Sequence, residues 1–140
     1  MNTTINNIQD EIIEEFEFFD DWLDKYEYII SLGKQLPLIE KGYKDEEHLI
    51  KGCQSQVWLH AEEQDEKVQF TADSDAVITK GIIALLIRAL SDQKADDIAK
   101  AELYFIDKIG LKEHLSPTRS NGLVSMVKQM KLYGLALATQ

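Results

Sequence analysis

The residue best suited to chemistry is Cys53, the only cysteine among 140 residues. It lies in the run Gly52-Cys53-Gln54-Ser55-Gln56-Val57-Trp58, where a glycine turn leads into an expected strand. A free cysteine with a structural role usually behaves as a small buried hydrophobe in an apolar stretch, whereas Cys53 has polar neighbours. From these neighbours alone, the thiol of Cys53 could equally be reactive or inert.

Metal sites and phosphate-binding loops do not fit this sequence. One cysteine supplies no zinc or iron–sulfur motif, and His48, His60 and His114 are too scattered to show ligand spacing. The glycines are isolated, and no lysine follows a phosphate cradle of the Walker type. We therefore expect the chain to bind no metal and no cofactor of its own.

Two kinds of thiol chemistry remain. A cysteine hydrolase needs a histidine base, for which His114 is the best candidate, although no motif supports that reading. A thiol that receives sulfur and passes it on needs a reachable nucleophile, a loop that moves between two partners, and a shielded intermediate. An acidic protein disfavours the thiolate unless a cation lies near it, and Lys51 and Arg119 are the candidates.

The composition excludes nucleic acid as a partner. The formal net charge is -10, and no basic stripe is present to neutralise phosphates. The acidic residues near the N-terminus form either a solvated helix face or a docking surface for a basic partner. These residues are Asp10, Glu11, Glu14, Glu15, Glu17, Asp20, Asp21 and Asp24.

The sequence also indicates where the protein works. The N-terminus lacks the pattern of a secretory signal, and a single cysteine forms no internal disulfide, so we expect a cytoplasmic protein. The longest strongly apolar stretch, 81–87, is far shorter than the roughly 20 residues of a membrane span. The length fits a single domain over residues 1–140, either monomeric or a homodimer.

Hydrophobic periodicity predicts an α+β fold in which a small antiparallel sheet of about three strands packs against helices. The first two helices are expected to pack as a hairpin, and one short strand at most is expected between them and Cys53. The predicted helices are 5–19, 21–36, 76–90, 96–101, 104–109 and 123–137, the strands lie at 57–62 and 68–72, and 114–121 is a loop.

Residue patterns within these elements predict which faces are buried. Val57, Leu59, Val68 and Phe70 share the inner face of the strand pair. Helix 76–90 is apolar nearly all round and should form the centre of the core, with N-caps available in 73–75. By contrast, the wet side of the first helix carries Glu11, Glu14 and Glu15.

Several blocks along the chain resemble the SufE family of sulfur-acceptor proteins. The run 52–58 is similar to the family's hallmark around its acceptor cysteine, and companion blocks extend over essentially the whole chain. These blocks are Trp22 with 25–30, Leu32-Gly33, Leu36-Pro37, Ser74-Asp75-Ala76, Lys80-Gly81 and the run 114–123. The segment 94–108 is the least similar.

The resemblance implies a function for Cys53. Members of the family accept persulfide sulfur from a pyridoxal-phosphate cysteine desulfurase of the SufS type, stimulate it, and pass the sulfur to iron–sulfur cluster assembly, here a scaffold of the SufBCD type. Their fold is similar to that of the IscU scaffolds, and pyridoxal phosphate belongs to the partner. Two alternatives stay open: a related CsdE-type activator of another desulfurase, and a non-covalent acidic docking module.

The same resemblance implies roles for the residues around Cys53. Gly52 gives the loop its freedom, and Gln54 and Ser55 hydrogen-bond the resting loop or simply form its turn. Arg119 is expected near this loop or the partner, and otherwise as a surface charge. Asp75 is expected first as a helix cap and second as a control on loop mobility.

Overall fold

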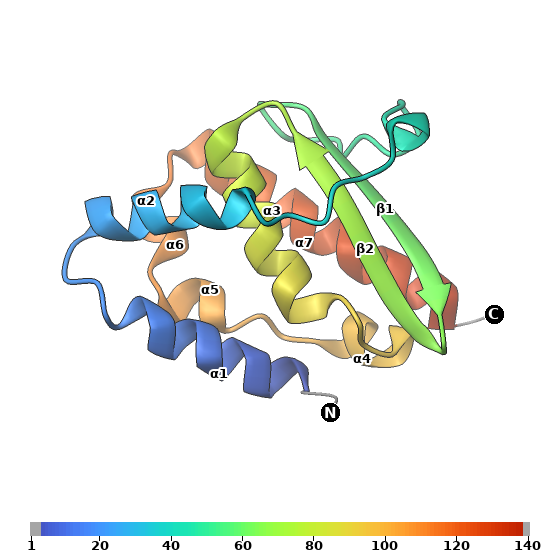
Figure 1. Cartoon of the computed structure of the whole chain (residues 1–140), viewed down its shortest axis with the longest axis horizontal. Coiled ribbons are helices and arrows are strands. Elements are labelled where there is room, and N and C mark those ends of the chain that lie inside the picture. The colour runs from blue at the N-terminus through green and yellow to red at the C-terminus, as the bar shows by residue number, and fades with distance from the viewer. Residues whose placement is uncertain (1–3, 139–140) are drawn as a thin grey trace.

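Helices pack against a small antiparallel sheet in the computed structural model of the chain, which describes residues 4–138 (Figure 1). The fold is α+β, as expected. The strands are β1 (Val57–Gln64) and β2 (Lys67–Ser74), and a 3-10 helix covers Lys41–Tyr43. The helices are α1 (Ile5–Phe16), α2 (Trp22–Gly33), α3 (Val77–Leu90), α4 (Ala95–Lys100), α5 (Phe105–Lys108), α6 (Leu111–His114) and α7 (Pro117–Ala138).

The two strands form the predicted hairpin. They pair antiparallel from Val57 opposite Ser74 down to a tight turn at Asp65 and Glu66. Both turn residues have positive φ, 53° and 67°, which a type I′ turn requires. The inner face is confirmed, because its four predicted side chains are at most 1% exposed: Val57, Leu59, Val68 and Phe70.

The expected count of about three strands is wrong by one within the described residues, which contain two. Short segments lie along the outer edges of the hairpin, but each makes one bridge pair, Leu38 with Ala72 and Leu49 with Trp58. Pro37 lacks an N–H group and the 3-10 helix follows it closely, so the first segment does not extend into a strand.

Helix α3 is the centre of the core, as its composition predicted. Ten of its 14 residues are buried, and it contacts α1, α2, α7 and β2. Gly81 lies directly against the backbone of α2, where a Cβ atom would stand 2.1 Å from the Ile29 carbonyl oxygen. The approach of α2 to α3 therefore depends on a residue without a side chain.

Helices α1 and α2 each end three residues earlier than expected, because their last turns tighten into i→i+3 hydrogen bonds. The expected hairpin of α1 and α2 is not formed, because each helix packs on α3 and not along the other. Their contact is made by the rings of Phe16 and Phe19, at and just after the end of α1, and of Tyr28 in the middle of α2. Glu15 is not on a wet face: its carboxylate pairs with Arg88 of α3 and accepts a hydrogen bond from Tyr28.

Helix α7 begins six residues before the predicted start at Leu123. Pro117 occupies the first turn, where its missing N–H group costs nothing, and the Ser116 hydroxyl accepts a hydrogen bond from the Arg119 amide. The cap-forming residues expected in a loop therefore build the start of this helix and place Arg119 on it. Among the described helices, none has the length and hydropathy to span a bilayer.

Candidate functional site around Cys53

Cys53 lies on a six-residue loop, 51–56, that precedes β1. The loop is closed at its base by the hydrogen bond from the Ile50 amide to the Val57 carbonyl, 2.8 Å. Gly52 has a φ of +89°, a conformation that other residues adopt only with strain. A glycine is therefore needed where the chain turns toward the cysteine.

The thiol of Cys53 faces α7 and is half-buried. Its Sγ atom lies 3.6 Å from the Gly122 carbonyl oxygen and donates to it. A cavity of about 10 Å³ adjoins the thiol, close to the volume that one water-sized atom needs. Its lining combines the loop, α3 and α7: Cys53, Gln54, Ser55, Thr79, Ile82, Thr118, Arg119, Gly122 and Met126.

Burial controls the protonation of this thiol. It raises the pKa of Cys53, because the thiolate would lose its hydration. Neither candidate cation offsets this effect of burial on the pKa. The Arg119 guanidinium donates its hydrogen bond to Thr79, and the Lys51 side chain is exposed to solvent. The resting residue is therefore a thiol, which is a poor nucleophile.

A hydrogen-bonded chain of three side chains joins the loop to both helices. Arg119 Nη1 donates to Thr79 Oγ1 at 2.9 Å, and the Thr79 and Ser55 hydroxyls lie 3.1 Å apart. This arrangement brings the predicted residues Arg119 and Ser55 together. Thr79 was missed, although a threonine at a core position of the most apolar helix was a visible signal, since a buried hydroxyl needs a partner.

Asp75 holds the other end of the loop and does not cap α3. Its Oδ1 atom accepts a hydrogen bond from the Gln56 amide at 3.0 Å, and its own amide donates to the Gln56 carbonyl at 3.3 Å. The N-cap position of α3 is Ala76, which makes no side-chain cap. The cap was the wrong expectation, because β2 continues through Ser74 and aims the Asp75 carboxylate back at the loop.

Gln54 is exposed at the edge of the cavity, and its side chain has no hydrogen bond to any other described residue. The hydrogen bond expected of Gln54 is therefore absent from the described part of the loop, whereas that of Ser55 is present. The Gln54 side chain is therefore open to an approaching molecule.

His114 cannot act on Cys53 from its position in this structure. Its ring stacks on Trp22, with centroids 4.4 Å apart, and its Nδ1 atom lies 2.9 Å from the Gly110 carbonyl oxygen. It does not line the cavity, so the geometry does not support the cysteine hydrolase reading.

The other two histidines are not scattered in space. His48 and His60 are hydrogen-bonded at 3.2 Å beside Tyr43, with a carboxylate at each end, Asp45 and Glu62. Even so, residues 4–138 contain no group of three or more His, Cys, Asp and Glu side chains placed to hold a metal ion.

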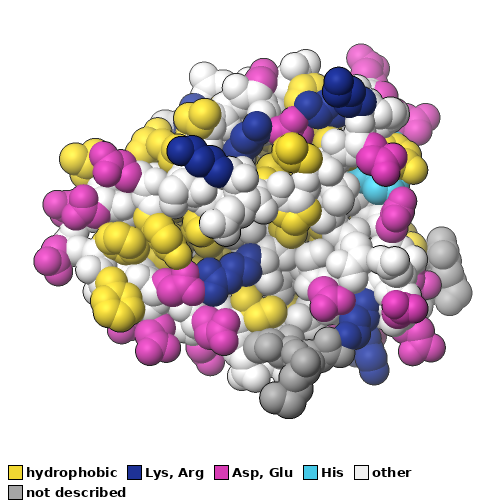
Figure 2. All heavy atoms as spheres, in the orientation of Figure 1, with side chains coloured by type: hydrophobic (Ala, Val, Ile, Leu, Met, Phe, Trp, Pro, Cys, Tyr) yellow, Lys and Arg dark blue, Asp and Glu magenta, His cyan; other side chains and the backbone are white. Residues whose placement is uncertain are grey.

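The acidic patch lies apart from the Cys53 loop. Figure 1 places α1 at the lower end of the molecule and the loop before β1 at the upper end. Figure 2 shows acidic side chains beside hydrophobic ones along the left and lower-left edge, over α1 and its connection to α2. Phe18 and Leu23 are the most exposed large apolar side chains there, at 83% and 66%.

Comparison with known proteins decides the family. The profile of the SufE domain, described as an Fe-S metabolism associated domain, matches residues 10–133. The chain belongs to the SufE family. Uncharacterized SufE-like proteins of Rhizobium meliloti and Rhizobium etli are 42% and 44% identical over 127 residues, which are 87% of this chain and 91% and 86% of theirs. Membership gives the chain an accessory role in iron–sulfur metabolism.

Two further relatives extend this comparison. The chloroplastic and mitochondrial SufE-like protein 1 of Arabidopsis thaliana is 38% identical over 91% of this chain, but the match covers 34% of that longer protein. The solution structure of a hypothetical protein from Thermus thermophilus superposes with a TM-score of 0.79 at 19% identity, covering 95% of this chain and 97% of the other. At 19% identity, the structural match supports the fold alone.

Proposed function

We propose that Cys53 receives a sulfur atom from the persulfide of a pyridoxal-phosphate cysteine desulfurase of the SufS type and hands it to iron–sulfur cluster assembly. The observation that carries this proposal is the position of the Cys53 thiol. It lies on a loop that turns at Gly52, and it faces a cavity with room for about one more atom. Membership of the SufE family supports it, since that domain is associated with iron–sulfur metabolism.

The transfer is a thiol–persulfide exchange. The Cys53 thiolate attacks the terminal sulfur of the desulfurase persulfide, a new sulfur–sulfur bond forms at Cys53, and the desulfurase cysteine leaves as a thiolate. The proton lost from Cys53 balances the charge of that leaving group. No external oxidant or reductant is needed, because one sulfur–sulfur bond replaces another. The chain is thus a carrier and activator, with no enzymatic turnover of its own.

Access requires the loop to move. In the resting state the thiol is half-buried and protonated, so a partner must draw the loop out and stabilise the thiolate on contact. Clearing the desulfurase of its persulfide in this way would raise the rate of desulfurase turnover. Shielding at rest also protects the thiol and its persulfide from oxidation.

The residues around Cys53 take defined roles in this proposal. Gly52 supplies the turn, and Asp75 anchors the loop through Gln56. Ser55 holds the loop in its resting position through its hydrogen bond with Thr79. Arg119, on α7, orients the Thr79 hydroxyl. The exposed Gln54 side chain is free to contact the partner.

Other parts of the proposal concern the partners. The sulfur would pass to a scaffold of the SufBCD type, and the pyridoxal phosphate stays on the desulfurase. A CsdE-type activator of a different desulfurase would use the same residues and the same chemistry. We place the protein in the cytoplasm, where an unpaired thiol stays reduced.

The test is the intact mass of the chain after incubation with a SufS-type desulfurase and cysteine. We expect the mass to rise by one sulfur atom, and dithiothreitol to remove it. Cys53→Ser should show no mass increase and no stimulation of cysteine turnover, with an unchanged circular dichroism spectrum. Arg119→Ala should keep the fold and lower the stimulation, because the cavity at Cys53 loses the cation that lines it and that would face the incoming persulfide.

The same experiment separates covalent transfer from docking. A chain that binds the desulfurase without taking up sulfur would keep its mass, and Cys53→Ser would then stimulate as well as the native chain. That result would rule out Cys53 as the acceptor and favour the docking module. Replacing the desulfurase with a CsdE partner enzyme in a parallel assay shows which desulfurase is preferred.

A further inference from the structure

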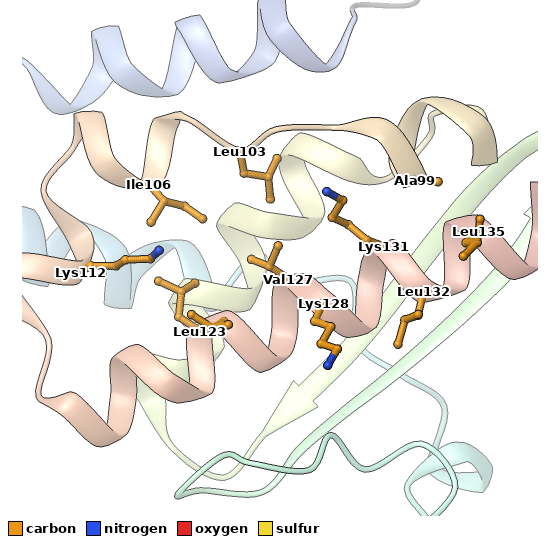
Figure 3. Close-up of a pocket in the computed structure, with 11 residues that line it drawn as sticks. Ala99, Leu103, Ile106, Lys112, Leu123, Val127, Lys128, Lys131, Leu132 and Leu135 are labelled. Atoms are coloured by element: carbon orange, nitrogen blue, oxygen red, sulfur yellow. The ribbon is translucent and has the colours of Figure 1, made fainter.

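A long apolar groove lies on the other side of α7 from the thiol. Figure 3 shows it between α7 and the segment that contains α4, α5 and α6. Its volume is about 530 Å³, and none of its residues lines the cavity at Cys53. This lysine groove is lined by Ala99, Leu103, Ile106, Lys112, Leu123, Val124, Val127, Lys128, Lys131, Leu132 and Leu135.

Helix α7 presents apolar residues on two sides, and the second side forms the floor of the groove. Its inner side carries the buried residues Leu123, Met126 and Met130. On the outer side, Val124, Leu132 and Leu135 expose 50%, 46% and 54% of their area. Exposed apolar residues gathered in a groove, unlike scattered ones, mark a binding surface.

The spacing on α7 suits a helical ligand. One row along the helix is Val127, Lys131 and Leu135, four residues apart, and the neighbouring row is Val124, Lys128 and Leu132. Rows at this spacing form the ridges and grooves by which helices pack against one another. From Val124 to Leu135 the floor is about 16 Å long, the length of a helix of about 11 residues.

The charge of the groove selects the chemistry of that ligand. The chain has a net charge of -10, yet the groove contains three lysines and no acidic residue. Lys112 lies on the α6 side, Lys131 points from α7 toward the segment with α4 and α5, and Lys128 points the other way, on the side of Leu132 (Figure 3). No ion pair or hydrogen bond within residues 4–138 occupies the ammonium group of any of the three.

We propose that the lysine groove is a docking site for an amphipathic, acidic α-helix of a partner protein. Its apolar side chains would lie on the two rows of α7 and against the opposite wall. Its carboxylates would meet the three lysines, which would lower competition from neutral or basic helices. Because this surface shares no residue with the cavity at Cys53, a helix can bind here while the loop is engaged.

The probe is a fluorescein-labelled synthetic peptide of about 14 residues, with leucines on one face at helical spacing and glutamates flanking them. A second peptide carries lysine at every glutamate, and a third has the leucines scrambled. We expect fluorescence anisotropy to show binding of the acidic amphipathic peptide only. The binding should weaken as sodium chloride is added, because salt screens the lysine–carboxylate attraction.

Exposed positions in the groove give variants that should keep the fold. Leu132→Asp, and separately the double variant Lys112→Glu/Lys128→Glu, should each weaken binding of the acidic peptide by about tenfold or more. The double variant should bind the lysine peptide in its place. Lys34→Glu/Lys41→Glu changes the net charge by the same amount at exposed sites outside the groove, and should bind the acidic peptide like the native chain.

Several results would overturn the proposal. Absence of binding, or binding that the groove variants leave unchanged, would show that the groove takes no acidic helix. Self-association of the native chain in sedimentation, abolished by Leu132→Asp, would assign the groove to a second copy. Dodecanoate that binds alone and displaces the peptide at far lower concentration would assign it to small amphiphilic anions. Because each readout is independent of sulfur uptake, these results do not depend on the role of Cys53.

Discussion

The Cys53 thiol is half-buried and protonated at rest in this structure. Burial by its neighbours raises the pKa of the thiol, and the cation that lines the cavity, on Arg119, donates its hydrogen bond to Thr79. Gly52 turns the chain at the start of the loop, and the hydrogen bonds that hold the loop at Cys53, Ser55 and Gln56 must yield when the thiol is presented to a partner. A carrier benefits from this combination, because a thiol that is inactive in solution reacts mainly with the protein that opens the loop.

The resting protonation gives a prediction in the isolated chain. At neutral pH, iodoacetamide should alkylate the native chain several-fold more slowly than the same chain unfolded in urea, since a higher pKa means less thiolate. The midpoint of the rate against pH should lie higher for the native chain. Mass spectrometry reports on Cys53 alone, because it is the only cysteine. Faster alkylation of the native chain would mean that a cation stabilises the thiolate.

At the scale of elements, the contact between α2 and α3 sets the position of the site. Helix α3 supplies Thr79 and Ile82 to the cavity, and α2 lies against it where Gly81 meets Ile29. A shift of α3 would therefore move two of the side chains that line the cavity. Packing of this kind is stiff, because interiors are as dense as organic crystals.

Gly81→Ala tests that contact. The new methyl group would stand 2.1 Å from the Ile29 carbonyl oxygen, so α2 and α3 must separate, and we expect the free energy of unfolding to fall by about 3 kcal/mol. Urea denaturation measures it. Gly42→Ala is the control: its methyl group has no atom within 4 Å, and it should be neutral or stabilise by about 0.5 kcal/mol. Equal effects of the two changes would show that the contact tolerates expansion.

At the scale of the whole molecule, Arg88 of α3 joins the N-terminal helix to the core through ion pairs with Glu15 and Glu11. Glu15 of α1 accepts two hydrogen bonds from Arg88 of α3, and these bonds, with that from Tyr28, hold the pKa of the carboxyl below its usual value. The unfolded chain therefore binds a proton here more readily than the folded one. This stability is present above about pH 4.5, the unperturbed value, and is lost as the pH falls through the lower folded pKa.

Glu15→Gln should reveal that contribution. Because the pair is about one-third exposed, we expect the loss of unfolding free energy at neutral pH to be about 0.5–1 kcal/mol. The difference from the native chain should shrink on acidification below about pH 4.5. Urea denaturation across the pH range measures both effects, and Glu14→Gln, on the exposed side of the same helix, should show neither. A difference that is the same at every pH would assign the effect to packing instead of charge.

Much of this protein was determined by patterns that the sequence carries by itself. Alternation of apolar residues reports which side of a strand is buried, so the hairpin of β1 and β2 and its inner face were predicted. The apolar run of α3 predicted the centre of the core in the same way. Cys53 stood out as the one possible nucleophile of its type, and the run around it indicated the SufE family, which the family profile confirmed.

Only the tertiary structure decided which side chains meet. Asp75 was expected to cap α3 and instead holds the loop, and Thr79 joins Ser55 to Arg119 across three segments distant in the chain. The ion pair of Glu15 and the lysine groove arise in the same way, between elements far apart in sequence. Hydrophobic periodicity indicates which side of each element faces the core. It does not indicate which other element lies against that side, because this depends on how all elements pack together.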